Sequence, residues 1–251
     1  MAQVEFIAHR GESADAPENT LAAFRLAWER KVDAIELDIH LTQDGEAIVC
    51  HDADTERTTG LRKVIRESAL AELRQLDAGR WKGAHWAGER LPTLREALET
   101  IPQGARCFIE IKTGPEAVPA VERAIRQSGK TPAQLAIISF RAESLAEAKR
   151  RLPQIKTYYL AGFRQDPAAH AWTPDVETLI AQAQSIRADG LDLSAPGPID
   201  SAFARRVQVA GLTLTVWTVD DPEIAQQMVA AGVDGITSNR AAWLRAELQR
   251  R

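Results

Sequence analysis

Short apolar runs alternate with longer amphipathic segments along almost the whole chain. The apolar runs predict eight strands, at residues 4–8, 34–39, 106–111, 135–139, 156–160, 190–193, 213–218 and 234–237. The amphipathic segments predict helices at residues 19–31, 93–100, 116–128, 142–151, 175–187, 200–210, 222–231 and 240–250. Eight strand-plus-helix units in 251 residues are typical of a (β/α)8 barrel, or TIM barrel, of the α/β class. An open doubly wound sheet is the alternative, but the first strand lacks a glycine-rich dinucleotide turn after it.

One interval interrupts this alternation. After an extended piece at residues 47–50, a long stretch passes without a clear strand before the third barrel strand. It contains the run Arg57-Thr58-Thr59-Gly60 and two tryptophans, Trp81 and Trp86, which favour a packed segment. We therefore predict one barrel domain over residues 1–251, with an insertion after the second strand at about residues 53–92 that partly caps the barrel mouth.

Composition excludes several classes of protein. The net charge is -4 and no basic block occurs, so a nucleic-acid partner is not expected. No apolar run approaches the roughly 20 residues of a membrane span, and the first residues do not resemble a signal peptide. We therefore expect a cytoplasmic protein without stable membrane association. Cys50 and Cys107 lie in apolar runs and are expected to be buried free thiols.

Acidic side chains stand near the ends of two predicted strands. Glu36 and Asp38 are two residues apart, so both point to one face of the strand, and Glu110 lies on the next barrel strand. In a (β/α)8 barrel the reactive groups project from the carboxyl ends of the strands. Three carboxylates form an oxygen-rich site for one hard cation, Mg²⁺ or Ca²⁺, with Mn²⁺ as a further candidate. Zinc would more often take histidine or cysteine ligands.

Basic and imidazole side chains stand at the same strand ends. Arg10 and Lys112 provide positive charge beside the acids, which favours an anionic ligand, in particular a phosphate. His9 and His51 remain free of the cation and can act as a general acid and a general base. Trp217, at the end of the seventh strand, either lines the site or packs within the barrel. This set suits metal-assisted cleavage of a phosphoryl ester.

The motifs along the chain resemble those of the glycerophosphodiester phosphodiesterases. The matching runs are His9-Arg10-Gly11, Pro17-Glu18-Asn19-Thr20, Glu36-Leu37-Asp38, Thr42-Gln43-Asp44-Gly45, His51-Asp52, Arg57-Thr58-Thr59-Gly60, Glu110-Ile111-Lys112, Ser139-Phe140 and Val216-Trp217-Thr218-Val219. They fall in the family's order and cover nearly the whole chain. One departure is Asp220, where the family often has asparagine.

The resemblance implies a (β/α)8 barrel with a small insertion, one divalent cation, and the hydrolysis of glycerophosphodiesters such as glycerophosphocholine or glycerophosphoethanolamine. The products would be sn-glycerol 3-phosphate and an alcohol. Carried over residue by residue, the metal ligands would be Glu36, Asp38 and Glu110, the acid–base pair His9 and His51, the phosphate-binding residues Arg10 and Lys112, and the glycerol-pocket residue Trp217. Which histidine is the acid, and whether a cyclic phosphate forms, stay open.

Two alternatives keep the same residues. A lysophospholipase D-like enzyme would need an apolar lip at the barrel mouth, which Trp81 and Trp86 could supply. A binding module without catalysis would be favoured by loss of one histidine or one metal acid, and none is lost. The remaining polar residues receive structural interpretations. We expect His40 to face the helix layer or solvent, His85, His170, Glu12 and Asp15 to be exposed, Glu18 and Asn19 to start the first helix or support the site, and Asp52 to orient His51 or cap a turn.

Overall fold

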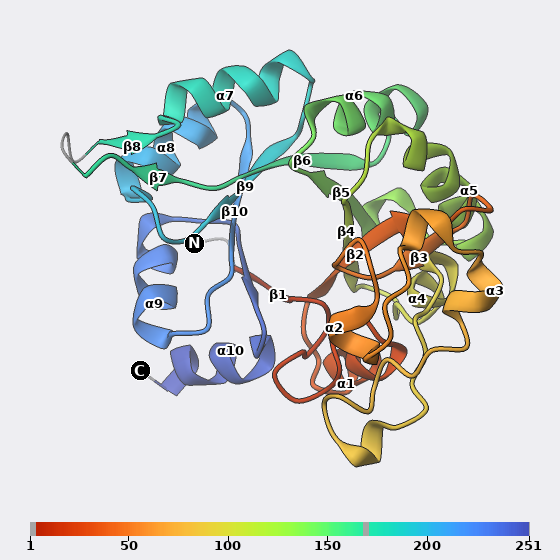
Figure 1. The fold of residues 1–251 in the computed structure, drawn as a ribbon. Helices are drawn as coiled ribbons and strands as arrows, with labels where there is room; N and C mark the ends of the chain where they lie inside the picture. The colour runs from red at the N-terminus through yellow and green to blue at the C-terminus, as the bar shows by residue number, and fades with distance from the viewer. Residues whose placement is uncertain (1–3, 168–170, 251) are drawn as a thin grey trace.

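The computed structural model describes residues 4–167 and 171–250, and within them the chain forms a closed barrel of eight parallel strands (Figure 1). Strand β1 pairs with both β11 and β2, which closes the ring in the order β1, β11, β10, β9, β6, β5, β4, β2. The barrel strands are β1 (Glu5–Ala8), β2 (Ala34–Leu41), β4 (Arg106–Ile111), β5 (Leu135–Ser139), β6 (Lys156–Ala161), β9 (Gly190–Ser194), β10 (Thr213–Trp217) and β11 (Gly235–Ser238). The predicted (β/α)8 fold is confirmed.

Helices follow the strands and surround the barrel (Figure 1). They are α1 (Leu21–Glu29), α4 (Leu94–Glu99), α5 (Val118–Ser128), α6 (Ala142–Arg151), α7 (Val176–Ser185), α8 (Ser201–Val209), α9 (Pro222–Ala231) and α10 (Ala241–Arg250), with short 3-10 turns η3 (Pro115–Ala117) and η4 (Pro132–Gln134). Side chains cap two of these helices: Thr93 and Asp221 accept hydrogen bonds from the first-turn amides of α4 and α9. Every helix of the described chain is too short or too polar to span a bilayer.

The strands are buried on both faces, which explains why they appear as nearly continuous apolar runs. Outward side chains such as Leu37 and Leu191 pack against the helices in the main core. Inward side chains form a separate, smaller cluster inside the barrel. Its members are Ile7, Ala34, Phe108, Ala136, Ile138, Tyr158 and Leu160. The barrel interior is therefore closed below the carboxyl ends of the strands, and the room for a ligand lies above this cluster.

The segment between β2 and α4 contains the region, at about residues 53–92, that we expected to be an insertion. It begins with β3 (Ala47–Val49), which pairs antiparallel with β2, and continues through α2 (Glu56–Thr59), η1 (Ile65–Glu67), α3 (Leu70–Leu73) and η2 (Ala84–Trp86). Aliphatic side chains form its buried core, while Trp81 is exposed and Trp86 is half-buried. The buried set is Ile48, Cys50, Ile65, Leu73, Leu76, Ala78 and Leu91. Figure 1 shows α2 beside the barrel opening and η2 at the outer edge.

The structure also contains a two-stranded hairpin that the apolar pattern does not predict. Strands β7 (Arg164–Gln165) and β8 (Trp172–Thr173) pair antiparallel between β6 and α7. Each has two residues, too few to show an alternation of apolar and polar positions. His170, which we expected at the surface, lies in this region outside the described residues. Cys50 and Cys107 are buried and free, as predicted.

Candidate active site

Three buried acids meet at the carboxyl ends of β2 and β4. Asp38 and Glu110 are register partners on these strands, and Glu36 points to the same side of β2. One carboxylate oxygen from each of the three residues lies within 4.8 Å of the other two. All three residues are buried. The acids that we predicted as metal ligands are therefore brought together by the pairing of two neighbouring strands.

Burial and mutual repulsion change the acidity of this cluster. Burial, then the charges of Asp38 and Glu110, raise the pKa of Glu36 well above its usual value. Burial and Asp38 raise the pKa of Glu110 to about 7. Burial also opposes ionisation of Asp38, but Arg10 and Lys112 outweigh it and lower the pKa of Asp38 to about 2. Without a further positive charge, the cluster thus holds protons that separate acids would release.

These donors fit a divalent cation. Oε1 of Glu36 is buried and has no hydrogen-bond partner in the described chain, although a buried carboxylate oxygen usually has one. A hard cation that prefers oxygen ligands would complete the coordination of this atom and remove the repulsion between the acids. The chemistry of the donor set therefore supports a candidate metal centre at Glu36, Asp38 and Glu110.

Two basic side chains border the acids. Nε of Arg10 lies 3.2 Å from Oδ2 of Asp38. Nζ of Lys112 lies 3.3 Å from Oδ1 of Asp38 and 2.8 Å from Oε1 of Glu110. Arg10 has a φ of 56°, and its backbone N–H donates to Oε2 of Glu36 at 3.0 Å. This left-handed backbone is held by the acid cluster itself, and strain of this kind concentrates at functional sites.

His9 is oriented by an amide from the carboxyl end of β11. Its Nδ1 lies 2.8 Å from Oδ1 of Asn239, and Nδ2 of Asn239 donates to Oδ2 of Asp220 at 2.6 Å. Asp220 accepts from Nδ2 of Asn239, so the amide oxygen Oδ1 faces His9 and can only accept a hydrogen bond. Nδ1 of His9 therefore carries the ring proton, and Nε2 of the neutral ring carries none. Nε2 lies 4.0 Å from Oε2 of Glu36. Burial, then the charge of Arg10, lower the pKa of His9, which favours the neutral ring.

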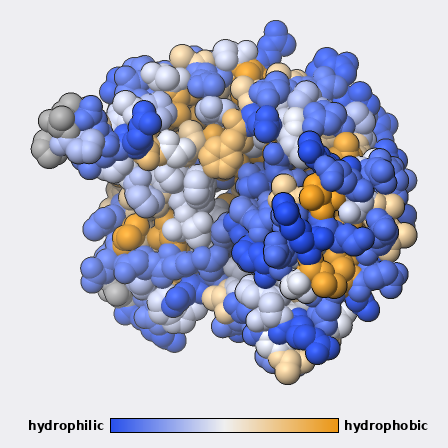
Figure 2. All heavy atoms as spheres, viewed as in Figure 1, coloured by the Kyte–Doolittle hydropathy of each residue, from blue (hydrophilic) through white to orange (hydrophobic). Residues whose placement is uncertain are grey.

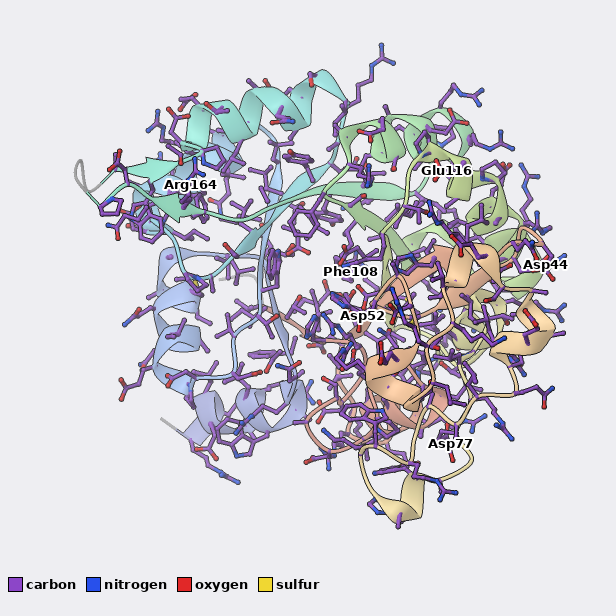
Figure 3. The ribbon with its side chains drawn as sticks, in the orientation of Figure 1. Asp44, Asp52, Asp77, Phe108, Glu116 and Arg164 are labelled. Atoms are coloured by element: carbon purple, nitrogen blue, oxygen red, sulfur yellow. The ribbon has the colours of Figure 1, made fainter. Side chains whose placement is uncertain are left out.

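His51 is oriented from the insertion side. Its Nδ1 lies 2.7 Å from Oδ1 of Asp52, so the expected pairing of these two residues is present. Asp52 in turn accepts a hydrogen bond from Nε of Arg57 at 2.6 Å. Arg57 also donates two hydrogen bonds of 2.8 Å to Glu18. Figure 3 shows Asp52 beside the central opening, next to α2. The insertion therefore takes part in positioning His51.

The acids and histidines open onto a pocket of about 230 Å³ in the barrel mouth. Its lining residues are His9, Arg10, Glu36, His51, Glu110, Lys112, Ile138, Phe140, Leu160, Asp192, Trp217, Thr218 and Thr237. Figure 2 shows a hollow in the middle of this face, with hydrophilic residues on the side where β2 and β4 end. Trp217 forms an edge-to-face contact with Phe140 at 5.7 Å between ring centroids, so it does line the pocket. Trp81 and Trp86 are not among the lining residues.

Two expectations about polar residues are wrong. His40 does not face the helix layer or solvent, because positions 36, 38 and 40 alternate onto one side of β2; it is buried, and its Nε2 lies 3.1 Å from the carbonyl oxygen of His51. Glu12 is fully buried instead of exposed. Its Oε1 accepts from the amide of Ala242 in the first turn of α10, and its Oε2 pairs with Arg30 at 2.7 Å.

Asn19 supports the acid cluster and does not cap α1. The capping residue is Thr20, whose side chain accepts from the amide of Ala23. Asn19 instead donates from Nδ2 to Oδ2 of Asp38 at 2.8 Å and accepts from the amide of Asp38 at 3.3 Å. Glu18, the other residue of this turn, accepts from Arg10 at 2.9 Å. We expected Glu18 and Asn19 either to start the first helix or to support the site, and their contacts with Arg10 and Asp38 favour support of the site.

Two residues of the site, Asn239 and Asp192, are absent from the sequence-based prediction. Asn239 directly follows the eighth barrel strand, and Asp192 is an acid inside an apolar strand. The same two signals identify His9 and Glu36. They are weaker here, because no motif surrounds Asn239 and because the strand of Asp192 has only a short apolar pattern.

The fold and this pocket define a (β/α)8-barrel enzyme with a candidate acidic metal centre between two histidines. Comparison with known proteins agrees. The model of the glycerophosphoryl diester phosphodiesterase family matches residues 9–242. A glycerophosphodiester phosphodiesterase of Caldanaerobacter subterraneus subsp. tengcongensis is 36% identical over 239 residues, covering 93% of each chain. One of Bacillus subtilis is 30% identical over 93% of this chain and 82% of the relative.

A solved structure extends the likeness to three dimensions. A phosphodiesterase of Oleispira antarctica, in complex with the product sn-glycerol 3-phosphate, is 30% identical, with a TM-score of 0.87 over 98% of this chain and 96% of that one. The present chain therefore belongs to the glycerophosphoryl diester phosphodiesterase family, and it is an enzyme that hydrolyses phosphoric diesters.

Proposed function

We propose that the enzyme hydrolyses small glycerophosphodiesters, such as glycerophosphocholine and glycerophosphoethanolamine, to sn-glycerol 3-phosphate and an alcohol, with one divalent cation, Mg²⁺ or Ca²⁺, or else Mn²⁺. The observation that carries this proposal is the buried cluster of Glu36, Asp38 and Glu110 in one pocket with two oriented histidines. The Oleispira antarctica relative, whose structure contains sn-glycerol 3-phosphate, supports the product. The single-domain division, with an insertion at about residues 53–92, is part of the same proposal.

The charged residues would bind the phosphoryl group. Glu36, Asp38 and Glu110 would hold the cation, which would supply positive charge to the phosphoryl oxygens. Arg10 and Lys112 line the same pocket and supply fixed positive charge to those oxygens, which stabilises the additional negative charge of the transition state. Ionisation of the acids on cation binding would leave both basic residues in place, since each is paired with Asp38.

The two histidines would move the protons. Each ring is held through Nδ1, His9 by Asn239 and His51 by Asp52, so in both rings Nε2 is the atom that can reach a ligand. One Nε2 would take the proton from the attacking O–H, either of water or of the neighbouring glycerol hydroxyl, and the other would give a proton to the departing alkoxide. If the glycerol hydroxyl attacks, a cyclic phosphate forms and water then opens it, with the two histidines exchanging roles. The proton balance closes because one ring gains what the other loses. Trp217 and Phe140 would supply an apolar wall for the carbon atoms of glycerol.

An assay on paired substrates tests the proposed function. We expect turnover of glycerophosphocholine with Mg²⁺ or Ca²⁺, no turnover after EDTA, and recovery when the cation is added back. Glycerophosphocholine should be preferred over lysophosphatidylcholine, because the tryptophans of the insertion lie outside the pocket lining and offer no lip for an acyl chain. Release of sn-glycerol 3-phosphate is the measurement for the first substrate and release of choline for both. Equal activity with EDTA, or a higher kcat/KM on the lysophospholipid, would reject the proposal.

Asp220→Ala is expected to lower kcat about tenfold with little change in KM. The substitution removes the carboxylate that fixes Asn239, so the tautomer of His9 is no longer set, and a lost charge-assisted hydrogen bond accounts for this magnitude. Asp221→Ala is the matched control. It removes the cap of α9, which costs about 1 kcal/mol of stability, but it leaves His9 untouched. Steady-state kinetics and thermal melts of both variants separate the two effects; equal kcat values would contradict the positioning role.

A further inference from the structure

One buried acid of the barrel interior is not used by the chemistry described above. Asp192 lies on β9, where it alternates inward while Leu191 and Leu193 face the helices. It is only 3% exposed, yet it lines the pocket. Its Oδ1 accepts a hydrogen bond from Oγ1 of Thr215 at 2.8 Å. Its Oδ2 has no hydrogen-bond partner in the described part of the chain.

The described residues around Asp192 provide no positive charge that would stabilise a carboxylate at this position. Its neighbours on the adjacent strand β6 are the apolar Leu160 and the ring of Tyr158 from the barrel-interior cluster. Burial raises the pKa of Asp192 to about 7, and only the hydroxyl of Thr215 opposes this rise. A buried carboxyl without a cation nearby destabilises a fold, whereas an apolar residue of similar size would not. An apolar residue at position 192 would make the fold more stable, so Asp192 is a candidate for a role in ligand binding.

The position of β9 in the ring indicates which part of a ligand Asp192 would contact. β9 is separated from β2 by four steps in either direction, so it stands directly opposite the strand that carries Glu36 and Asp38. Asp192 lies one side-chain layer below Trp217, because Trp217 is the register partner of Ser194 and donates its indole N–H to the carbonyl oxygen of Asp192 at 3.1 Å. A ligand whose phosphate lies at the acid cluster would therefore extend its far end toward Oδ2 of Asp192.

We propose that Asp192 binds the terminal hydroxyl of the substrate's glycerol group and thereby selects glycerol over alcohols that lack this hydroxyl. The inference rests on the proposed function and deepens it. The apolar and aromatic wall of Ile138, Leu160 and Trp217 suits the C–H bonds of glycerol, and the single open carboxylate oxygen suits one O–H group. A carboxylate accepts a hydrogen bond from a hydroxyl, and a protonated carboxyl can donate one, so binding survives in both states. The same acid would repel a phosphate and so favours one orientation of the ligand.

The test compares two substrates that differ by one hydroxyl. Glycerophosphocholine is set against 2-hydroxypropyl phosphocholine, which keeps the head group and the middle hydroxyl and lacks only the terminal one. We expect the wild type to prefer glycerophosphocholine about 10- to 100-fold in kcat/KM, the range for a hydrogen bond to a charged group. Asp192→Leu should bring this ratio close to 1, mainly by raising KM for glycerophosphocholine. An unchanged ratio, or an equal loss on both substrates, would overturn the proposal.

Further variants keep the result interpretable. Asp192→Asn retains the shape of the side chain and should lower the ratio less than leucine does, so it carries the test if the leucine variant does not fold. Asp189→Asn is the matched control, because Asp189 precedes the same strand and pairs with Lys149 and the amide of Thr157 outside the pocket. Its ratio should equal that of the wild type. A change in the preference between glycerophosphocholine and glycerophosphoethanolamine, with the hydroxyl ratio unchanged, would assign Asp192 to the alcohol head group and reject glycerol binding.

A binding experiment separates this inference from the proposed function. Calorimetric titration with sn-glycerol 3-phosphate and with 2-hydroxypropyl phosphate, in the presence of Mg²⁺, needs no turnover. The wild type should bind the first ligand about 10- to 100-fold more tightly, and Asp192→Leu should bind both alike. An enzyme that shows this difference but no cation-dependent hydrolysis would refute the proposed function and retain the role of Asp192. Equal binding of both ligands by the wild type would refute the role of Asp192 alone.

Discussion

His9→Ala is expected to lower kcat for glycerophosphocholine by about 10²- to 10⁴-fold, the usual contribution of a general acid or base. In the proposed mechanism the imidazole would act in proton transfer and Arg10 and Lys112 would still bind the phosphate, so the loss should appear in kcat. His51→Ala should cause a loss in the same range. The double variant should be little worse than either single one, since two groups that serve one reaction do not contribute independently.

A second histidine serves as the control for this prediction. His85 is exposed on η2, outside the pocket lining, and His85→Ala should leave kcat and KM unchanged. Thermal melts of the His9 variant should remain close to those of the wild type, because the hydrogen bond to Asn239 is a single side-chain contact. Retention of full activity by His9→Ala, measured by release of sn-glycerol 3-phosphate, would refute the proposed acid–base pair.

Removal of the divalent cation should make the stability of the enzyme fall as the pH rises from about 4.5 to 7. The pKa of Glu110 is about 7 in the fold and 4.5 for a free side chain, and the pKa of Glu36 is raised as well. In this window the folded form holds more protons than the unfolded form, so the free energy of unfolding decreases with pH. For Glu110 alone the decrease is of the order of 3 kcal/mol. Asp38, with a pKa of about 2, titrates below this window.

Addition of Mg²⁺ should reverse this loss. A cation bound at the proposed site would bind the ionised acids, displace their protons and stabilise only the folded form. At 100 times its Kd this amounts to about 3 kcal/mol, or a Tm increase of about 5–10 °C for a chain of this size. The proton release is measured by calorimetry in buffers of different ionisation enthalpy. Glu36→Gln removes one charge, so its metal-free form should lose less stability with pH and gain little from Mg²⁺. A wild type whose Tm does not respond to Mg²⁺ would refute the metal site; pH dependence alone would not support it, because Asp192, outside the acid cluster, has a pKa of about 7 and titrates in the same window.

The sequence predicts the barrel well, for a physical reason. Strands buried on both faces need long apolar runs, and the helices between them need an amphipathic period, so both signals are strong in a parallel barrel. The hairpin of β7 and β8 carries no such signal, because its strands are two residues long. In the insertion, the tryptophans are the more conspicuous residues of the sequence, but the aliphatic side chains around Ile65 and Leu73 are buried while Trp81 is exposed.

The sequence predicts most of those residues of the site that lie on barrel strands or at their carboxyl ends. Glu36 and Asp38 stand out because two acids in an apolar run are unusual, and the pairing of β2 with β4 places Glu110 beside them. Two residues further along β2, the same alternation places His40 inward as well. Contacts such as that between Asn239 and His9, 230 positions apart, depend on closure of the ring and have no local signal.

The double link of Arg57 to Glu18 and Asp52 bears on attempts to re-engineer this enzyme for other substrates. The segment at about residues 53–92 looks like a natural place to graft loops from relatives. Yet its first short helix, α2, carries Arg57, which binds the Asp52 that orients His51. Arg57 also binds Glu18, which accepts a hydrogen bond from Arg10. Chimeras should therefore be joined after Gly60, with the helix left intact. A graft that begins at residue 53 would replace Arg57 as well as the outer loops. It would then lower the catalytic rate at the same time as it changes the substrate range, and most clones of such a library would be inactive.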